Sequence, residues 1–221
     1  MEMKTNENLQ KDVQDAIKWE PLLNAAEIGV IAKDGVITLT GTVDSYAKKS
    51  EAEKAAKSVN GVKAVVEEIE IRFGSYGKKS DTEIAEDILS AFAANWEVPD
   101  DKVKVKVEDG WVTLEGELKW NFQKDAAKKS VNNLVGVIGV INNITIKPES
   151  HDEVERKGIE RALERNWSIG DQDIQVKVSG SKVTLNGTVH SFYERDEADR
   201  IAWNAPGVCI VDNELVIEYA D

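Results

Sequence analysis

The chain is poor in the residue types that carry most enzyme chemistry. Its 221 residues include two histidines and a single cysteine, Cys209. One cysteine excludes an intrachain disulfide. His151 and His190 have no partner histidine at helical or hairpin spacing, so we expect no metal site. Nucleophile-elbow, Walker and dinucleotide-binding glycine patterns are also absent from the sequence. We therefore expect no cofactor and no catalytic activity.

Long apolar runs are also missing. No stretch approaches the roughly 18 apolar residues that a membrane-spanning helix needs. Residues 1–20 are polar and charged and hold no apolar core of a signal peptide. As written, the sequence predicts a soluble cytoplasmic protein. A periplasmic location would follow if a signal had been trimmed from the N-terminus.

Positive charge is the third deficit. The chain has 28 basic and 41 acidic residues, a net charge of −13. Residues 149–221 hold 8 basic and 16 acidic residues, so this last third carries −8 of that total. An acidic surface repels nucleic-acid phosphates and anionic lipid headgroups. Nucleic-acid binding is therefore not expected, and membrane binding cannot depend on the overall charge.

What the sequence does have is a threefold repeat. The segment at residues 36–43, VITLTGTV, returns as WVTLEGEL at 111–118 and as KVTLNGTV at 182–189. The Thr-Leu-x-Gly core recurs at offsets of 75 and then 71 residues. Self-similarity at a fixed spacing predicts one small unit repeated along the chain. We place the three repeats at residues 1–73, 80–147 and 151–221, with motif glycines Gly41, Gly116 and Gly187.

Each repeat predicts the element order α-β-β-α-β. In the second repeat Ile84, Ile88 and Phe92 form one apolar helical stripe, and valines alternate with lysines over residues 102–107. Asp109-Gly110 suits a two-residue hairpin turn of type I′. A helical crossover makes the second and third strands parallel if they are adjacent, and the crossover should be right-handed. The fold class is α+β, with two helices on one face of a three-stranded mixed sheet in every repeat.

The motif glycines interrupt strand interiors and so require an explanation. By alternation they face the same side as the preceding leucines, toward the helices. We interpret them as points where helix and sheet approach too closely for a side chain. The alternative is a gap or bulge that helps to form a ligand site.

The α-β-β-α-β unit, the V-x-L-x-G-x-V strand and the glycine-valine pair before the third strand resemble the BON domain family. The resemblance covers nearly the whole chain, in three copies. The family occurs in osmotically induced periplasmic proteins of the OsmY kind, in some secretins and in some channel proteins. It implies a non-enzymatic module that binds phospholipid or associates with envelope components, with the motif glycines carried over. The chain departs from OsmY-like proteins in having three copies and no signal peptide.

Aromatic residues are the best candidates for a binding surface. Trp96 and Trp167 stand at equivalent positions after the first helix of their repeats, and Trp19 falls two places earlier. We expect these three to close the core. Other aromatics gather where the second strand meets the second helix, and Trp111 lies beside the hairpin turn. They either fill contacts inside the protein or form an edge that docks on lipid or a partner, and the candidates are Tyr46, Trp111, Trp120, Phe122, Phe192 and Tyr193.

Three alternating lysines, Lys102, Lys104 and Lys106, are predicted on the outer face of the second sheet. They protect the sheet from edge pairing, or they form a basic strip that meets lipid phosphates. The sequence therefore favours a non-enzymatic binding or scaffolding protein whose partner is a phospholipid surface, related to envelope or osmotic stress. The alternative is a cytoplasmic protein–protein interaction module with no lipid role.

Overall fold

The computed structural model describes residues 4–74, 79–147, 154, 156–169 and 173–218. Each repeat is described by itself. The elements of the first repeat are α1 (Asn6–Trp19), the 3-10 helix η1 (Ala25–Glu27), β1 (Ile28–Lys33), β2 (Val36–Val43), α2 (Tyr46–Lys57) and β3 (Ala64–Ile71). Those of the second are α3 (Asp81–Ala94), η2 (Asp100–Lys102), β4 (Val103–Glu108), β5 (Trp111–Leu118), α4 (Asn121–Asn132) and β6 (Gly139–Ile146). The third has α5 (Arg156–Glu164), β7 (Ile174–Ser179), β8 (Lys182–Val189), α6 (Phe192–Trp203) and β9 (Ile210–Ile217).

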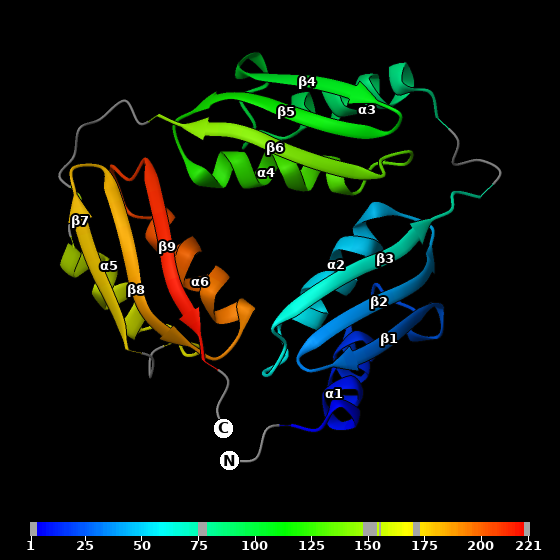
Figure 1. The fold of residues 1–221 in the computed structure, drawn as a ribbon. Coiled ribbons are helices and arrows are strands. Elements are labelled where there is room, and N and C mark those ends of the chain that lie inside the picture. The colour runs from blue at the N-terminus through cyan, green and yellow to red at the C-terminus, as the bar shows by residue number, and fades with distance from the viewer. Residues whose placement is uncertain (1–3, 75–78, 148–153, 155, 170–172, 219–221) are drawn as a thin grey trace. The chain divides into compact units, whose positions relative to one another are not determined.

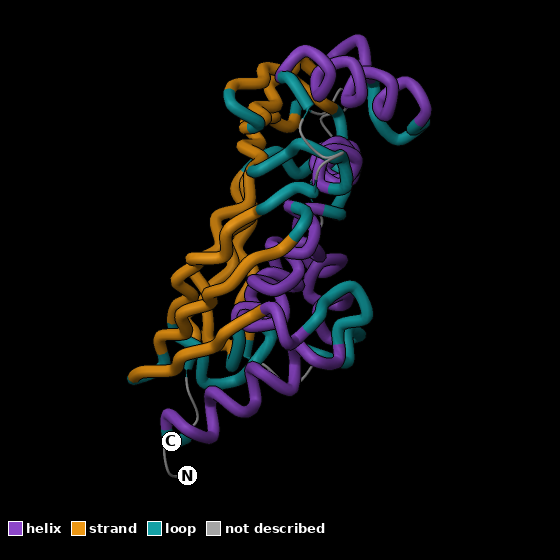
Figure 2. Tube along the Cα trace, turned by 90° about the vertical axis from the view of Figure 1, so that its right-hand side faces the viewer, coloured by secondary structure: helices purple, strands orange, loops and turns teal. Residues whose placement is uncertain are grey.

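Each repeat forms its own three-stranded sheet with the second strand in the centre, as Figure 1 shows. In the second repeat β4 pairs antiparallel with β5, and β5 pairs parallel with β6. The third repeat has the same pairing over β7, β8 and β9. Helices lie on one face of each sheet (Figure 2). The predicted α+β fold is therefore confirmed, and in the second and third repeats the second and third strands are adjacent and parallel.

The core of each repeat lies between its helices and its sheet. In the second repeat Ile88 and Phe92 of α3 and Val112 and Leu114 of β5 are at most 1% exposed. They pack with the small residues of α4, of which Ala127 is fully buried. The outward side chains of the same strands, such as Lys104 and Glu115, remain exposed. One face of each sheet is therefore covered by helices and the other is open.

The hairpin turn forms as the sequence predicts. Asp109 and Gly110 have φ values of 48° and 77°, and a type I′ turn requires positive φ at both central residues. The carboxylate of Asp81, in the first turn of α3, accepts hydrogen bonds from the backbone N–H groups of both turn residues at 2.9 Å. Asn6 of α1 accepts the equivalent bond from Asp34 at 2.8 Å. The first helix therefore begins at the hairpin end of its repeat.

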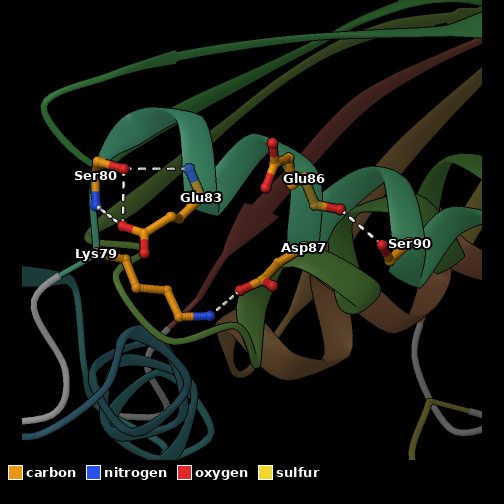
Figure 3. Close-up of polar contacts among 6 residues, drawn as sticks. All are labelled: Lys79, Ser80, Glu83, Glu86, Asp87 and Ser90. Carbon is orange, nitrogen blue, oxygen red and sulfur yellow. Dashed lines mark hydrogen bonds and ion pairs between the residues drawn. The ribbon is translucent and has the colours of Figure 1, made fainter.

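The start of α3 is held by a capping box (Figure 3). The Ser80 hydroxyl accepts a hydrogen bond from the backbone N–H of Glu83, whose carboxylate accepts from the backbone N–H of Ser80. This pattern satisfies two N–H groups that have no partner inside the helix, and it lowers the pKa of Glu83. Lys79 also forms an ion pair with Asp87, two turns along the helix (Figure 3). The start of α3 is therefore fixed by residues in and directly before its first turn.

The interpretation of the motif glycines as a close approach of helix and sheet is wrong. A Cβ atom on Gly116 would overlap the backbone carbonyl oxygen of Lys102, immediately before the start of β4. Gly41 and Gly187 meet the carbonyl oxygens of Glu27 and Asp173 in the same way. All three have positive φ, at 125°, 150° and 131° in chain order. The glycines are therefore required by the neighbouring strand's backbone and by their own conformation.

Candidate functional site

The three tryptophans expected to close the core are instead on the surface. Trp19, Trp96 and Trp167 are 84%, 87% and 91% exposed. In the second and third repeats, the residue two positions after the tryptophan closes the core instead. These residues are Val98, which is 5% exposed, and Ile169, which is 2% exposed. The expectation failed because it assigned the burial to the largest apolar side chain and not to the aliphatic residue that follows it.

A short polar turn explains why Trp96 and Trp167 point outward. The side-chain oxygen of Asn95 accepts a hydrogen bond from the backbone N–H of Glu97 at 3.1 Å, and Asn166 accepts from Ser168 at 2.9 Å. This local bond reverses the chain within two residues of the helix end. The tryptophan between the bonded residues therefore lies at the tip of the turn.

The same asparagines attach this turn to the second helix of the repeat. The Asn95 amide donates to the Ser130 hydroxyl of α4 at 3.0 Å, and the Asn166 amide donates to the Glu197 carboxylate of α6 at 2.8 Å. Glu197 also pairs with Arg200 at 2.6 Å, and this pair, with Asn166, holds the pKa of Glu197 below its ordinary value. The exposed indoles are therefore carried on anchored turns and not on loose loops.

The candidate aromatics at the start of the second helices are half exposed. Trp120, Phe122 and Tyr193 are 42%, 43% and 46% exposed, and Tyr46 and Phe192 are half-buried. In the third repeat the buried Ser191 caps α6 by accepting a hydrogen bond from the backbone N–H of Glu194 at 3.2 Å. The cap fixes where the helix begins and so where the two aromatics that follow it lie.

Chain topology brings these aromatics to the same end of each repeat as the exposed tryptophans. In the second repeat Val103 pairs with Gly116, so the turn that carries Trp96 leads into β4 where β5 ends. Trp120 and Phe122 follow directly from that end of β5. Tyr46 instead packs against the buried cluster of the second repeat. We call this the aromatic end of a repeat, formed by Trp19 in the first, Trp96, Trp120 and Phe122 in the second, and Trp167, Phe192 and Tyr193 in the third.

Trp111 does not belong to this group. It is the first residue of β5 and pairs with Glu108 beside the hairpin turn, at the opposite end of the sheet from Trp120. Its indole lies across Gly139 on the open face, where a Cβ atom would overlap the ring. Ile141, on the same face of β6, is 46% exposed and Trp111 is 50% exposed. The candidate aromatics therefore divide between the two ends of the second repeat.

The lysine strip lies on the open face of the second sheet, and acidic side chains accompany it. Lys104 stands directly opposite Glu115. Lys106 forms an ion pair of 2.9 Å with Glu108, and both side chains are more than 60% exposed. Lys102 lies in η2, next to the start of β4. Two of the three lysines therefore have a carboxylate directly beside them.

Among the described residues, no group of three or more His, Cys, Asp or Glu side chains is placed to hold a metal ion. Within those same residues, no helix has the length and apolar character to cross a bilayer. Within the described part of the chain, burial beside β9 raises the pKa of Asp199 on α6, although a hydrogen bond from Asn213 opposes the shift. That bond joins the Asn213 amide to Oδ1 of Asp199 at 3.4 Å.

Comparison with known proteins supplies the family. A family model described as BON domain matches residues 5–72, 80–148 and 151–219. The chain is 33% identical to Osmotically-inducible protein Y of Escherichia coli (strain K12) over 129 residues, which cover 57% of this chain and 64% of that protein. It is 34% identical to a 21 kDa hemolysin of Actinobacillus pleuropneumoniae over 139 residues, covering 62% of this chain and 68% of the relative.

Solved structures that align over nearly the whole chain include the C-terminal domain of CdsD, the structural protein of the Type III secretion system of Chlamydia trachomatis. The alignment covers 97% of this chain and 100% of that one, with 16% identity and a TM-score of 0.26. At that score the superposition supports no argument about how the repeats are placed.

Proposed function

Because the chain belongs to the BON domain family, we propose that it is a non-enzymatic binding protein that docks on phospholipid surfaces through the aromatic ends of its repeats. The observation that carries the proposal is the exposure of Trp19, Trp96 and Trp167, each above 80% and each at the close of a first helix. Isolated exposed apolar residues need no explanation. An exposed tryptophan at or just after the end of the first helix in all three repeats does need one.

Tryptophan suits the boundary between water and lipid. Its ring is largely apolar, its N–H needs a polar partner, and it is enriched at membrane interfaces for that reason. In the second repeat the exposed Trp96 has Trp120 and Phe122 at the same end, both above 40% exposed. These side chains lose unfavourable contact with water when they enter the headgroup region.

The charge distribution favours docking through the aromatics over docking through the lysines. The net charge of −13 repels anionic headgroups. The lysine strip faces its own carboxylates, with Lys106 paired to Glu108 and Lys104 opposite Glu115. Binding is therefore expected to be at least as strong on neutral as on anionic vesicles, and to change little with salt.

Three copies on one chain favour avidity. A single aromatic end offers a small apolar contact, and binding through one of them is expected to be weak. Linking three weak sites raises the effective concentration of the second and third once the first is engaged. The names of the two relatives, an osmotically-inducible protein and a hemolysin, support a role in osmotic stress at the cell envelope.

The alternative proposal is a protein-interaction module with no lipid role, and the open sheet faces favour it. Each carries exposed apolar side chains: Ile31 and Val66 in the first repeat, Trp111 and Ile141 in the second, and Ile210 and Val216 in the third, all between 42% and 59% exposed. Apolar side chains gathered on an open face are typical of surfaces that bind other proteins.

Vesicle flotation separates the two proposals. Wild type, a Trp96→Ala/Trp120→Ala/Phe122→Ala variant and a Lys104→Glu/Lys106→Glu variant are floated with neutral and anionic vesicles at low and high salt. We expect wild type and the lysine variant to float and the aromatic variant to float at most about a tenth as well. Ile141→Ser on the open face is the matched control and should float like wild type. Wild type that stays at the bottom under every condition would remove the lipid proposal and leave the protein-partner one.

A further inference from the structure

The first strand of the first repeat is a sheet edge without the charge that the other two repeats carry there. Among the described strands β1 pairs with β2 alone, and it lies at the edge of its sheet (Figure 1). At one position of the edge strand, opposite a threonine of the central strand, the second repeat has Lys106 and the third has Lys177. The first repeat has Ile31 there, and it is 58% exposed. Lysine on an edge strand discourages pairing with another chain, so β1 lacks a protection that β4 and β7 have.

The hairpin determines which backbone groups of β1 face outward. Lys33 and Val36 stand opposite each other on either side of the two-residue turn, and residues in that position exchange hydrogen bonds with each other. Bonded and non-bonded pairs alternate from there along the ladder. The residues of β1 whose N–H and C=O groups point away from β2 are therefore Ile28, Val30 and Ala32.

An antiparallel copy of β1 matches these groups when Val30 stands opposite Val30 of the second copy. The two valines then exchange two backbone hydrogen bonds, and the Ala32 N–H of each copy donates to the Ile28 carbonyl of the other. The Ile28 N–H is not needed for this, since it already donates to the Ala25 carbonyl. The pairing has a two-fold axis at the valines, so it is closed at two copies.

The same register matches the exposed side chains. Glu27 of each copy stands opposite Lys33 of the other, and both residues are exposed. The neutral Asn24 amide donates to Oε1 of Glu27 at 3.0 Å, so the carboxylate keeps its negative charge. Ile31 stands opposite the exposed Gly29 of the second copy and loses part of its contact with water there. Opposite charges and apolar contacts across paired strands both stabilise a sheet.

The other sheet edges fit this arrangement less well. Self-pairing of β4 in the same register would place Lys104 opposite Lys106, and like charges directly opposite each other are destabilising. The other edge of the first sheet is β3, where the Glu67 carboxylate already accepts the backbone N–H of Ile69 at 3.1 Å. The complementarity is therefore a property of β1.

We propose that two copies of the chain associate through β1 and form one continuous six-stranded sheet with Val30 at the two-fold axis. The proposal goes beyond lipid docking, because it gives the first repeat a protein partner, a second copy of the chain. A single pair of short strands buries less than the roughly 1,200 Å² of a stable interface, and the net charge of −13 on each copy opposes association. We therefore expect a weak dimer, with a dissociation constant of about 0.1 to 1 mM.

Sedimentation equilibrium of the full chain tests the dimer, at about 0.15 M salt to screen the overall repulsion. Between about 10 μM and 1 mM the average mass should rise from the 24.4 kDa of one chain toward that of two. Ile31→Lys installs the lysine of the other repeats and should raise the dissociation constant at least about tenfold. Val66→Lys places the same charge on the open face at β3, where Val66 is 42% exposed. It is the matched control and should dimerise like wild type.

A charge exchange tests the register. Lys33→Glu and Glu27→Lys each place like charges opposite each other and should weaken the dimer several-fold, whereas the two substitutions together should restore it. A register shifted by two residues separates these positions and predicts no restoration. Hydrogen exchange gives a local readout, because the Val30 and Ala32 amides should become protected as the concentration of wild type rises and not in Ile31→Lys. Circular dichroism confirms that each variant is folded.

Four results would overturn the proposal: a monomer throughout the concentration range, a dimer that Ile31→Lys leaves unchanged, equal loss in Val66→Lys, or no restoration by the charge exchange. Equal loss in Val66→Lys would mean that the copies meet through the open face and not through the edge. Failure here is distinguishable from failure of lipid docking. A chain that floats on vesicles but stays monomeric loses only the dimer, and a chain that dimerises but does not float loses only the docking.

Discussion

At the residue scale, Gly116 has the tightest backbone constraint in its repeat. Its φ of 150° is in the range that side chains disfavour, and the Lys102 carbonyl oxygen occupies the place of a Cβ atom. A side chain here must break the pairing at the start of β4. The recurrence of glycine in the motif is therefore a requirement of the fold, and it is no argument for a ligand site.

Gly116→Ala is expected to destabilise the second repeat by about 2 to 4 kcal/mol, since backbone strain adds to a steric overlap that no side-chain rotation relieves. Denaturant unfolding followed by circular dichroism measures the change. Gly74→Ala is the control, because nothing lies within 4 Å of a Cβ atom there, and it should stay within about 0.5 kcal/mol of wild type. Equal effects of the two substitutions would refute the steric account.

Asp199 gives a pH-dependent prediction. Burial raises its folded pKa above the ordinary 3.8, so the folded state binds this proton more tightly than the unfolded chain does. The group therefore lowers the stability of the folded state as the pH rises through these pKa values. Below both values the carboxyl is neutral in each state and its penalty disappears.

Asp199→Asn should accordingly raise the midpoint of thermal unfolding at pH 7, and the gain should shrink toward zero near about pH 3. Thermal melts at the two pH values give the difference directly, and the exposed Glu218→Gln serves as the control. A gain that is the same at both pH values would mean that ionisation of Asp199 is not its cause.

At the element scale, a side chain of the third strand accepts a hydrogen bond from a backbone N–H of that same strand in each repeat. The Asn142 side-chain oxygen accepts a hydrogen bond from the Ile144 backbone N–H at 3.2 Å, and its amide donates to the Lys124 carbonyl of α4 at 3.2 Å. Asn213 makes the same two bonds in the third repeat, to Leu215 and Arg195. Glu67 makes the first of them in the first repeat. An edge N–H that is already bonded is a poor template for pairing with another chain.

Asn142→Ala should lower the free energy of unfolding by about 1–3 kcal/mol, because the Ile144 N–H and the Lys124 carbonyl each lose their hydrogen bond to Asn142. Native-state hydrogen exchange is the sharpest measurement, and the Ile144 amide should exchange faster by a factor that matches this loss. Asn143→Ala is the matched control, since Asn143 lies on the open face and is exposed. The account fails if Asn143→Ala accelerates exchange at Ile144 as much as Asn142→Ala does.

Much of each element could be predicted from the sequence because the signals are local. Alternating valines and lysines in β4, the Asp109-Gly110 turn and the Ser80–Glu83 capping box each depend on residues a few positions apart. The outward position of Trp96 could not be predicted from hydrophobicity, because a hydrogen bond from Glu97 to Asn95 decides it. An asparagine directly before the tryptophan in both later repeats was the available signal.

The features that could not be predicted from the sequence depend on residues far apart along the chain. The obstacle at Gly116 is the carbonyl oxygen of Lys102 on the neighbouring strand, which only the pairing register reveals. Trp111 begins β5 and Trp120 follows shortly after its last residue, so the length of this single strand separates the two side chains.

At the scale of the whole molecule, the chain combines a net charge of −13 with an exposed tryptophan at the end of the first helix in every repeat. Acidic charge disfavours contact with nucleic-acid phosphates. In the docking that we propose, the aromatic ends supply the attraction to lipid, and salt does not screen it.

The most direct test of the central claim is quenching of a single tryptophan by brominated phospholipid. One variant keeps Trp96 and replaces the other five tryptophans by phenylalanine, and a second keeps only Trp111, which lies at the hairpin end of the same repeat. With vesicles present, Trp96 emission should shift to the blue and be quenched by bromines near the headgroups, while Trp111 emission should not change. Quenching of Trp111 with Trp96 unaffected, or no quenching of either, would contradict docking through the aromatic ends.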